Sequence, residues 1–425
     1  MREIAADVAV IGGGPAGMAA ALKASDLGAT VALVERDPDL GGILNQCVHD
    51  GFGLIRFGRQ MSGAEYAQVF ADRVYDSPIN VMTGTTVLKL QRGARGFELH
   101  LTGEKTGAAL MTSGAVILAM GCRERTRPQV RIMGTRPAGV LTAGAVQKYI
   151  NIEGYLPGRR AVILGSGDIG LIMARRMTLE GMEVAGVYEI MPSPGGLRRN
   201  IAQCLDDYGI PLHLSTTVRQ VHGNRRVEGV TVARVEESGG ARRAIPGSEK
   251  YVACDLLVLS VGLIPENELS RNAGVEMNPI TGGPELDNMM MTSIPGVFAA
   301  GNVSAVFDLV DYVSDTGERA AEGACGYLSG DKGVLDCIPP IAGDGVSFVV
   351  PGRIRRKDPA SELYLRVKRT IRGARLEVSA SFGGKPDEII AARNCPIMTP
   401  PEMATVSLPS CVGEADRVTV RVVEG

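Results

Sequence analysis

The sequence predicts an α/β protein in which one doubly wound unit occurs twice and is followed by a small β-rich domain. Three observations support this fold class. A glycine motif at Gly12–Gly17 recurs at Gly165–Gly170, and each copy lies between an apolar, β-branched run and a stretch rich in Ala, Leu and Met. Strand, glycine turn, helix and strand in that order are typical of a parallel α/β sheet. Beyond Pro340, several short runs, two of which alternate apolar residues with Arg or Lys, predict strands.

Both glycine motifs have the spacing of a dinucleotide-binding turn. The first reads Gly12-Gly13-Gly14-Pro15-Ala16-Gly17 and the second Gly165-Ser166-Gly167-Asp168-Ile169-Gly170. The first Gly makes the turn, the second lets the backbone approach a pyrophosphate, and the third lets the helix pack on the strand. The N-terminus of the helix then offers N–H groups and a positive dipole end to the phosphates. We therefore expect two Rossmann-like domains, each with its own dinucleotide.

An acidic residue ends the second strand of each unit. Glu35 closes the run Thr30–Glu35, and Glu189 closes the run Val184–Glu189. A carboxylate about 20 residues after the glycines is placed to accept hydrogen bonds from ribose hydroxyls. Later segments also repeat, since Ile210–Val218 echoes Pro78–Val87 and Leu256–Gly262 echoes Ala115–Gly121. Two copies of one fold account for this pattern.

Composition limits the function classes. The 45 Lys and Arg residues nearly balance 47 Asp and Glu residues, and no block of like charge suggests a nucleic-acid-binding tail. No apolar stretch reaches the roughly 20 residues of a transmembrane helix. The N-terminal run leads straight into the glycine turn, so we expect no cleavable signal and a cytoplasmic protein. The eight cysteines form no CxxC pair and no zinc-like spacing, so no metal site is expected.

Four motifs in order identify a resemblance. Gly12–Gly17, Ala119-Met120-Gly121, Gly165–Gly170 and Ala299-Ala300-Gly301-Asn302 lie within residues 4–328. In this order they resemble flavoproteins with two dinucleotide-binding domains, the pyridine nucleotide–disulfide oxidoreductase class. The resemblance implies an FAD-binding domain in two parts (residues 1–155 and 271–335) and an NAD(P)-binding domain (156–270). The β-rich domain then spans residues 341–425.

The motifs and the resemblance together assign the cofactor-binding residues. For FAD these are Gly12, Gly14, Pro15, Ala16, Gly17, Glu35, Arg36, Gly42, Ala119, Gly121, Gly301 and Asn302. For the nicotinamide nucleotide they are Gly165, Gly167, Asp168, Ile169, Gly170 and Glu189. The resemblance places Gly301 and Asn302 near the ribityl chain and pyrophosphate of FAD. A second domain that has lost its ligand and serves as scaffold is the alternative.

Three segments resemble one branch of the class more closely: Gly41–Gly53, Met120–Arg125 and Asp308–Tyr312. This branch includes FAD subunits found beside glycerol-3-phosphate dehydrogenases and described as NADH oxidases. Subunits of opine oxidase and hydrogen cyanide synthase are more distant relatives. The branch implies a partner subunit, either a second flavoprotein or a small Cys-rich protein, and the β-rich domain is a candidate docking surface.

The chain departs from the disulfide reductases of the class. Asn302 stands where the class usually has Asp; its amide oxygen still accepts a hydrogen bond, so we expect FAD to be retained. Cys47 is the one cysteine in the loop where the reductases carry two, and the last histidine is His222, so the C-terminal proton donor is missing. Glutathione-reductase-type chemistry is therefore not expected.

Two further questions stay open in the sequence. Glu189 favours NADH, because its carboxylate would repel the 2′-phosphate of NADPH. Arg198 and Arg199 would instead favour that phosphate if they do not belong to a solvated loop. Cys47, with His49 as a neighbouring cation or acid, is a candidate catalytic pair beside the flavin; the alternative is a buried thiol that only packs.

The sequence thus predicts an FAD-dependent oxidoreductase that takes hydride from NADH. The electrons then pass to O2, a disulfide, a quinone or a partner subunit. One alternative is an FAD subunit of a multi-subunit glycerol-3-phosphate, amine or opine dehydrogenase. The other is a non-catalytic flavin scaffold. Asp308 and Asp311 are expected at the N-terminus of a helix that approaches the flavin, or are simply helix-terminal charges. Cys122, Cys395 and Cys411 are expected to be structural thiols.

Overall fold

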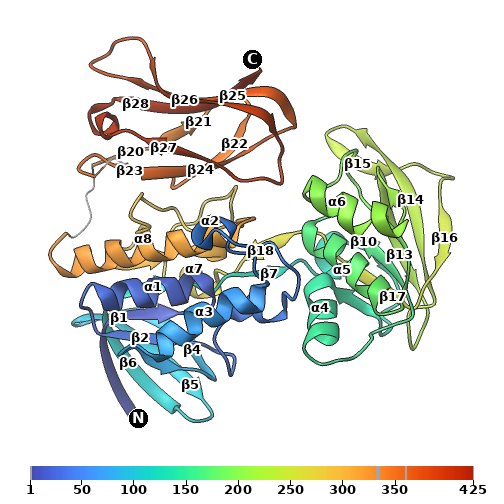
Figure 1. Ribbon diagram of the computed structural model, residues 1–425, viewed down its shortest axis with the longest axis horizontal. Helices are drawn as coiled ribbons and strands as arrows, with labels where there is room; N and C mark the ends of the chain where they lie inside the picture. The colour runs from blue at the N-terminus through green and yellow to red at the C-terminus, as the bar shows by residue number, and fades with distance from the viewer. Residues whose placement is uncertain (1, 332–335, 359–360, 425) are drawn as a thin grey trace. The chain divides into compact units, whose positions relative to one another are not determined.

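The computed structural model describes residues 2–331, 336–358 and 361–424, and the chain divides into two compact units. The first comprises Met1–Cys122 and Pro265–Gly425, and the second comprises Arg123–Ile264. The chain leaves the first unit along β7 (Cys122–Glu124) and returns along β18 (Leu263–Pro265); these two strands pair with each other (Figure 1).

The first unit contains a sheet with a parallel centre and an antiparallel edge. Its strand order is β3-β2-β1-β6-β5-β4, and β19 also pairs with β6. The strands are β1 (Arg2–Ile11), β2 (Val31–Val34), β3 (Asn80–Met82), β4 (Thr85–Gly93), β5 (Gly96–Gly103), β6 (Gly107–Leu118) and β19 (Val297–Ala299). The apolar run at Val8–Ile11 is buried because β1 pairs in parallel with both β2 and β6 beneath helices.

Helices of the first unit pack closely on one another and on this sheet. They are α1 (Pro15–Asp26), α2 (Leu54–Phe57), α3 (Gly63–Tyr75), α7 (Glu268–Asn272) and α8 (Val310–Leu328), with 3-10 turns at Gly42–Gln46 and Gly301–Val303. The contact of α1 with α8 needs a glycine, because a Cβ on Gly317 would lie 2.2 Å from the Ala16 carbonyl oxygen. This contact joins the first turn of α1 to the middle of α8.

The second unit repeats the parallel arrangement and adds a largely antiparallel sheet. The parallel sheet has the order β12-β11-β10-β17-β9 and is formed by β12 (Leu212–His213), β11 (Glu183–Tyr188), β10 (Arg160–Leu164), β17 (Leu256–Leu259) and β9 (Val140–Thr142). Its helices and turns are α4 (Ala143–Asn151), α5 (Asp168–Leu179), α6 (Arg198–Cys204) and the 3-10 turns Arg127–Val130 and Asp206–Tyr208. The other sheet holds β8 (Met133–Gly134), β13 (Thr216–His222), β14 (Gly229–Ser238), β15 (Ala241–Ala244) and β16 (Lys250–Ala253).

The contact-defined second unit begins earlier than the sequence boundary at residue 156. Residues 123–155 belong to it because β9 pairs with β17, and buried residues of α4 share a hydrophobic cluster with α5. The second unit ends at Ile264, whereas the boundary expected from the sequence is residue 270.

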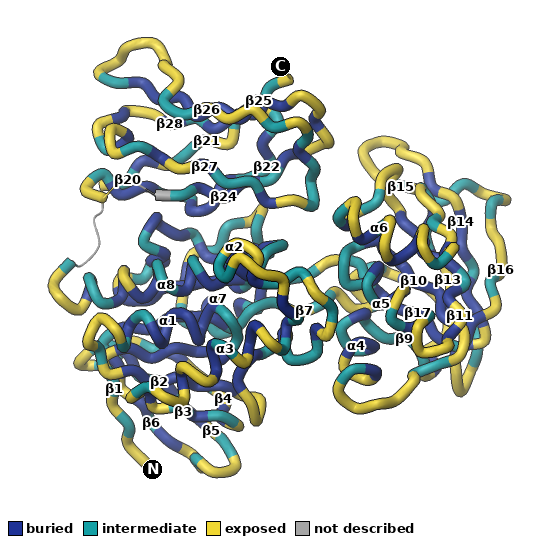
Figure 2. Tube along the Cα trace, in the orientation of Figure 1, coloured by how far each residue is buried: buried dark blue, intermediate teal, exposed yellow. Residues whose placement is uncertain are grey.

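The C-terminal part of the first unit is a small β-sandwich. One sheet has the order β21-β28-β25-β26 and the other β22-β24-β27, and their inner faces share one hydrophobic cluster (Figure 2). The strands are β21 (Pro340–Ala342), β22 (Val346–Val350), β24 (Ser361–Val367), β25 (Ile371–Ser381), β26 (Glu388–Met398), β27 (Ala404–Leu408) and β28 (Arg417–Glu424). A separate pair, β20 (Cys337–Ile338) and β23 (Ile354–Arg355), and a 3-10 turn at Ser410–Glu414 complete it.

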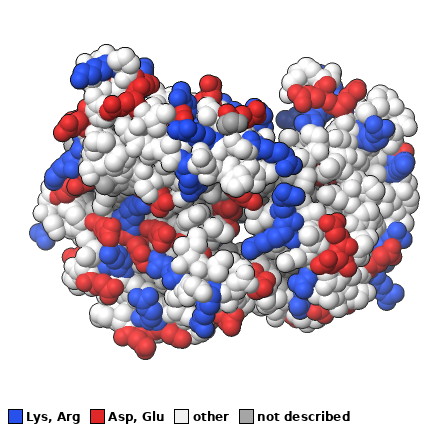
Figure 3. All heavy atoms as spheres, turned by 45° about the horizontal axis from the view of Figure 1, so that its top comes forward, with Lys and Arg blue, Asp and Glu red and all other residues white. Residues whose placement is uncertain are grey.

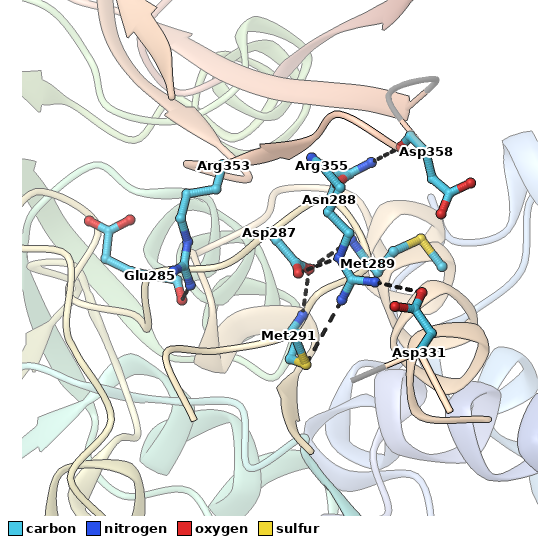
Figure 4. A network of polar contacts seen from close by, with 9 residues as sticks. All are labelled: Glu285, Asp287, Asn288, Met289, Met291, Asp331, Arg353, Arg355 and Asp358. Atoms are coloured by element: carbon cyan, nitrogen blue, oxygen red, sulfur yellow. Dashed lines mark hydrogen bonds and ion pairs between the residues drawn. The ribbon is translucent and has the colours of Figure 1, made fainter. Parts of the chain in front are cut away.

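A buried ion pair attaches this sandwich to the rest of the first unit (Figure 4). The side chain of Arg355 is 2% exposed, and its Nε lies 2.6 Å from Oδ2 of Asp287. Its Nη1 lies 3.3 Å from Asp331, and its backbone N–H donates to the side chain of Asn288 at 2.9 Å. The charge of Arg355 is therefore compensated at a point where β23 meets the segment that precedes β19.

On the face shown in Figure 3, acidic and basic side chains are interspersed, in keeping with a formal net charge of −2. Within the described residues, none of the helices is both long and apolar enough to span a bilayer.

Candidate functional site

The first glycine turn leaves space in front of helix α1. Gly12 has φ +108°, and a Cβ there would lie 2.4 Å from the Ala119 carbonyl oxygen. A Cβ on Gly17 would lie 1.8 Å from the Gly12 oxygen. By contrast, a Cβ on Gly14, the N-cap of α1, would meet no atom within 4 Å. The turn is thus closed tightly on the protein side and open where the first-turn N–H groups of α1 point.

Glu35 ties the end of β2 to this turn. The residue is 6% exposed, and its carboxylate accepts from Gly13 N–H at 2.6 Å and from Asp37 N–H at 2.8 Å. Two backbone donors hold the carboxylate beside the glycine turn, where a ribose would lie. Arg36, the next residue, is exposed.

The segment after Glu35 folds back over the glycine turn. Gly41 N–H donates to the Gly13 carbonyl at 2.8 Å, and a Cβ on Gly42 would lie 3.2 Å from Cα of Gly14. Gly42 therefore borders the open space in front of α1.

Two other strand ends reach the same place. Ala119 follows β6, and its N–H donates to the Ile11 carbonyl at 2.8 Å; at Gly121, φ is +70° and a Cβ would meet nothing within 4 Å. Gly301 follows β19, and a Cβ there would lie 2.8 Å from Cβ of Ala16, in the first turn of α1. The structure thus brings Ala16, Ala119 and Gly301 to one edge of the sheet.

Asn302 has its amide oriented by two contacts. Its Oδ1 accepts from Phe307 N–H at 2.9 Å, and its Nδ2 donates to the Cys122 sulfur at 3.6 Å. The open space at Gly14, the carboxylate of Glu35 and the approach of Gly301 fit the shape and the hydrogen-bonding groups that FAD requires.

The second unit builds its glycine turn in the same way. A Cβ on Gly165 would lie 2.0 Å from the Ser260 carbonyl oxygen, and one on Gly170 would lie 2.6 Å from Cβ of Ser260. At Gly167, the N-cap of α5, the nearest atom to a Cβ would be Oγ of Ser260 at 3.4 Å, an ordinary contact. Ile169 is half-buried and packs on the core of this unit.

Glu189 takes the same place as Glu35. Its Oε2 accepts from Ser166 N–H at 2.9 Å and from Ser166 Oγ–H at 2.6 Å, and its Oε1 accepts from Met191 N–H at 2.9 Å. The carboxylate is buried and fixed beside the glycine turn.

A further repeat follows each acid and escaped the sequence analysis. Six and seven residues after Glu35 come Gly41 and Gly42; six and seven after Glu189 come Gly195 and Gly196. Gly195 N–H donates to Ser166 Oγ at 2.8 Å, so this segment also folds over the second residue of its motif. The sequence shows this repeat as the pattern E-x5-G-G, in which Pro38 and Pro192 each lie three residues after the acid.

The first helical residue differs between the two sites. Pro15 begins α1, whereas Asp168 begins α5. Oδ1 of Asp168 accepts from Leu197 N–H at 2.8 Å and from Asn200 Nδ2 at 2.7 Å. Asp168 thus places a negative charge in the first turn of α5 and fixes the start of α6, which carries the exposed Arg198 and Arg199.

Cys47 and His49 lie in the segment between Gly42 and α2. Cys47 is 9% exposed and its thiol donates to the Ile43 carbonyl at 3.3 Å. Nδ1 of His49 lies 2.9 Å from the Asp50 carbonyl oxygen, and its ring centroid is 5.1 Å from that of Phe52. These contacts hold both side chains in place.

The two aspartates near the start of α8 have protein partners. Asp308 accepts from Met403 N–H at 3.2 Å, and the buried Asp311 accepts from Arg56 N–H at 3.1 Å. Arg56 also contacts Asp315 and Glu318, at 3.0 and 2.8 Å, and burial raises the pKa of both these carboxyls. These charges stabilise the packing of α2 on α8.

The other cysteines differ in their surroundings. Burial raises the pKa of Cys254 to about 11, which keeps it a thiol. Cys395 lies in β26 and Cys411 is exposed. Among the residues that the structure describes, no three His, Cys, Asp or Glu side chains are grouped to hold a metal ion.

Comparison with known proteins agrees with this architecture. A family model described as pyridine nucleotide-disulphide oxidoreductase matches residues 6–321. The fold is similar to that of thioredoxin reductase from T. acidophilum, with a TM-score of 0.62 and 23% identity over 76% of this chain and 98% of the reductase. The prediction of two dinucleotide-type domains followed by a β-rich region is confirmed.

Two components of larger enzymes are similar in sequence. An opine oxidase subunit of Agrobacterium tumefaciens is 27% identical over 71% of this chain, and hydrogen cyanide synthase subunit HcnB of Pseudomonas protegens is 27% identical over 70%. The matches span 61% and 66% of the lengths of these two relatives.

Proposed function

Because the chain belongs to the pyridine nucleotide-disulphide oxidoreductase family of flavin- and NAD(P)H-dependent enzymes, we propose that it takes hydride from NADH onto FAD and passes the electrons to another acceptor. The observation that carries this proposal is that the two glycine turns are built alike. In each turn, an acid accepts hydrogen bonds from backbone N–H groups at equivalent positions. A domain that no longer bound a nucleotide would not need to keep these hydrogen bonds.

FAD is assigned to the first unit. Gly14 and Gly42 would border its pyrophosphate, Glu35 would face its ribose, and Gly301 and Asn302 would lie by its ribityl chain. Bound there, FAD supplies the hydride acceptor, and the protein supplies orientation and a fixed polar surrounding. Because Gly17 has no Cβ, helix α1 can pack closely against the Gly12 carbonyl, and Ala119 lies beside the same turn.

The nicotinamide nucleotide is assigned to the second unit, with NADH preferred. The carboxylate of Glu189 is held beside the turn by Ser166 and Met191, so it cannot swing away from a ribose 2′-substituent without breaking three hydrogen bonds. Two ribose hydroxyls can donate to it, whereas a 2′-phosphate would be repelled. Gly165, Gly167, Asp168, Ile169 and Gly170 form the rest of this site.

The electron acceptor is proposed to be a partner subunit. The two relatives above are named as subunits of an oxidase and a synthase. In this proposal the chain works like the FAD subunits found beside glycerol-3-phosphate dehydrogenases. The partner subunit would dock on the C-terminal sandwich. O2, or a disulfide reached through Cys47, is the other acceptor to be tested.

A second candidate function is an FAD subunit of an opine, amine or glycerol-3-phosphate dehydrogenase, in which electrons enter from a carbon substrate. The similarity to an opine oxidase component favours it. In that enzyme the second unit would hold a different nucleotide, or none.

An anaerobic titration of the purified protein with NADH tests the proposal. Loss of the visible absorption of the oxidised flavin, faster with NADH than with NADPH, is the expected result. A flavin that stays oxidised with both nucleotides would refute the NADH proposal. Reduction by an opine or glycerol 3-phosphate in the presence of partner subunits would then support the second candidate, and no reduction by any donor would indicate a flavin scaffold.

A further inference from the structure

The C-terminal sandwich contacts the rest of the first unit at three consecutive residues between Asn302 and helix α8. The Val306 carbonyl accepts from Nη2 of Arg366 at 3.1 Å, the Phe307 ring meets the Tyr364 ring edge-on at 5.2 Å, and the Asp308 carboxylate accepts from Met403 N–H at 3.2 Å. All three residues lie in the stretch from Asn302 to Tyr312, here called the 302–312 segment.

Tyr364 is the centre of this contact. Its side chain is fully buried and belongs to the hydrophobic core of the first α/β sheet, whereas its neighbours Leu363 and Leu365 belong to the core of the sandwich. Successive side chains of a strand point to opposite faces, so β24 shares its residues between two cores. The Tyr364 ring also lies 5.4 Å from that of Tyr312 and 5.9 Å from the guanidinium of Arg319.

The contact continues from Phe307 to Asn302. Phe307 N–H donates to Oδ1 of Asn302 at 2.9 Å, and the other end of that amide contacts Cys122. Phe307 thus takes part in both contacts: its ring packs against Tyr364, and its backbone N–H holds Oδ1 of Asn302.

We propose that Tyr364 is a positioning residue of the FAD site: by holding Phe307 from the C-terminal sandwich, it orients Asn302 toward the flavin ribityl chain. The inference rests on the proposed function, which puts FAD in the first unit. It makes the C-terminal sandwich part of the flavin site rather than an appendage. The tyrosine hydroxyl is not needed for this role, since within the described structure it has no hydrogen-bond partner.

The test compares three full-length variants. Tyr364→Leu keeps an apolar side chain but removes the aromatic edge contact, and we expect the dissociation constant for FAD to rise about three- to tenfold, with an altered visible circular dichroism of the bound flavin. Tyr364→Phe keeps the ring and should restore both. Leu365→Ala, the matched control, should lower the unfolding midpoint of the sandwich and leave FAD binding unchanged.

Two outcomes would overturn the inference: FAD binding and flavin dichroism unchanged in Tyr364→Leu, or FAD binding weakened equally in Leu365→Ala. Should Tyr364→Leu fail to fold, hydrogen exchange of the wild-type apoprotein decides, because a segment held by the sandwich is protected before FAD is added. Fast exchange at Phe307 in that apoprotein contradicts the inference. A wild-type chain that binds no FAD would instead refute the proposed function.

Discussion

Glu35 and Glu189 make the same pair of backbone hydrogen bonds, 154 residues apart in the chain. Each carboxylate accepts from the second residue of the preceding glycine motif and from the residue two positions after the acid itself. Each is then followed, at the same spacing, by a Gly-Gly pair that folds over the motif. The two turns therefore match in their individual hydrogen bonds and are two copies of one local structure.

Glu189 is expected to set the coenzyme preference. In Glu189→Gln the charge that opposes a 2′-phosphate is gone, so the ratio of kcat/KM for NADPH to that for NADH should rise by about tenfold. Flavin reduction under anaerobic conditions measures it. Glu35→Gln is the matched control, because it should weaken FAD retention without changing this ratio. An unchanged ratio in Glu189→Gln would mean that another residue determines the preference between NADH and NADPH.

Asp168 is expected to weaken binding of the nicotinamide nucleotide. Its carboxylate adds negative charge to the helix turn that is proposed to receive the pyrophosphate, where the proposed FAD site has Pro15. Asp168→Asn keeps an oxygen for Leu197 N–H and removes the charge, so the dissociation constant for NAD+, measured by calorimetry, should fall about three- to tenfold. Asp207→Asn, which removes an exposed charge from the same unit, should leave the constant unchanged. Equal effects of both variants would assign the change to net charge alone.

Cys47 is expected to be dispensable for reduction of the flavin by NADH. Its buried thiol donates to the Ile43 carbonyl, and hydride transfer needs no thiol. Cys47→Ala should therefore show wild-type rates in anaerobic stopped-flow absorbance. A long-wavelength band on reduction of the wild type that disappears in Cys47→Ala would establish the thiol as a redox partner of the flavin.

Arg355 is expected to contribute strongly to stability. Arg355→Ala leaves Asp287 buried without its cation, which costs about 3–5 kcal/mol in the free energy of unfolding. Arg369 pairs with Glu424 at an exposed site, so Arg369→Ala should cost about 0–1 kcal/mol. Urea unfolding followed by circular dichroism compares them. Equal losses would show that the pair in Figure 4 is not a main attachment of the sandwich.

Much of the fold was predictable from local patterns. The glycine motifs, the buried runs before them and the acids after them each depend on a few neighbouring residues, and Gly12, Gly17 and Gly165 occupy places where a Cβ would collide with backbone. The β-rich character of the C-terminal region also followed from its alternating runs.

Contacts between distant segments were not predictable. No sequence pattern predicts that Asp168 accepts a hydrogen bond from Leu197. The residues next to Tyr364 likewise do not indicate that its side chain enters a hydrophobic core outside its own sandwich. Such contacts depend on how strands and loops meet in three dimensions. The repeat of Gly41-Gly42 at Gly195-Gly196 is different, because the spacing from each acid was readable and was missed.

The central claim, that the two units bind different nucleotides, is tested most directly by one measurement on two matched variants. Gly14→Ala and Gly167→Ala each add a methyl group that meets no protein atom closer than 3.4 Å, so both chains should fold. The dissociation constants for FAD and for NAD+ are measured on both. We predict weaker FAD and unchanged NAD+ binding in Gly14→Ala, and the reverse in Gly167→Ala. Loss of both ligands in one variant, or of neither in both, would contradict the account.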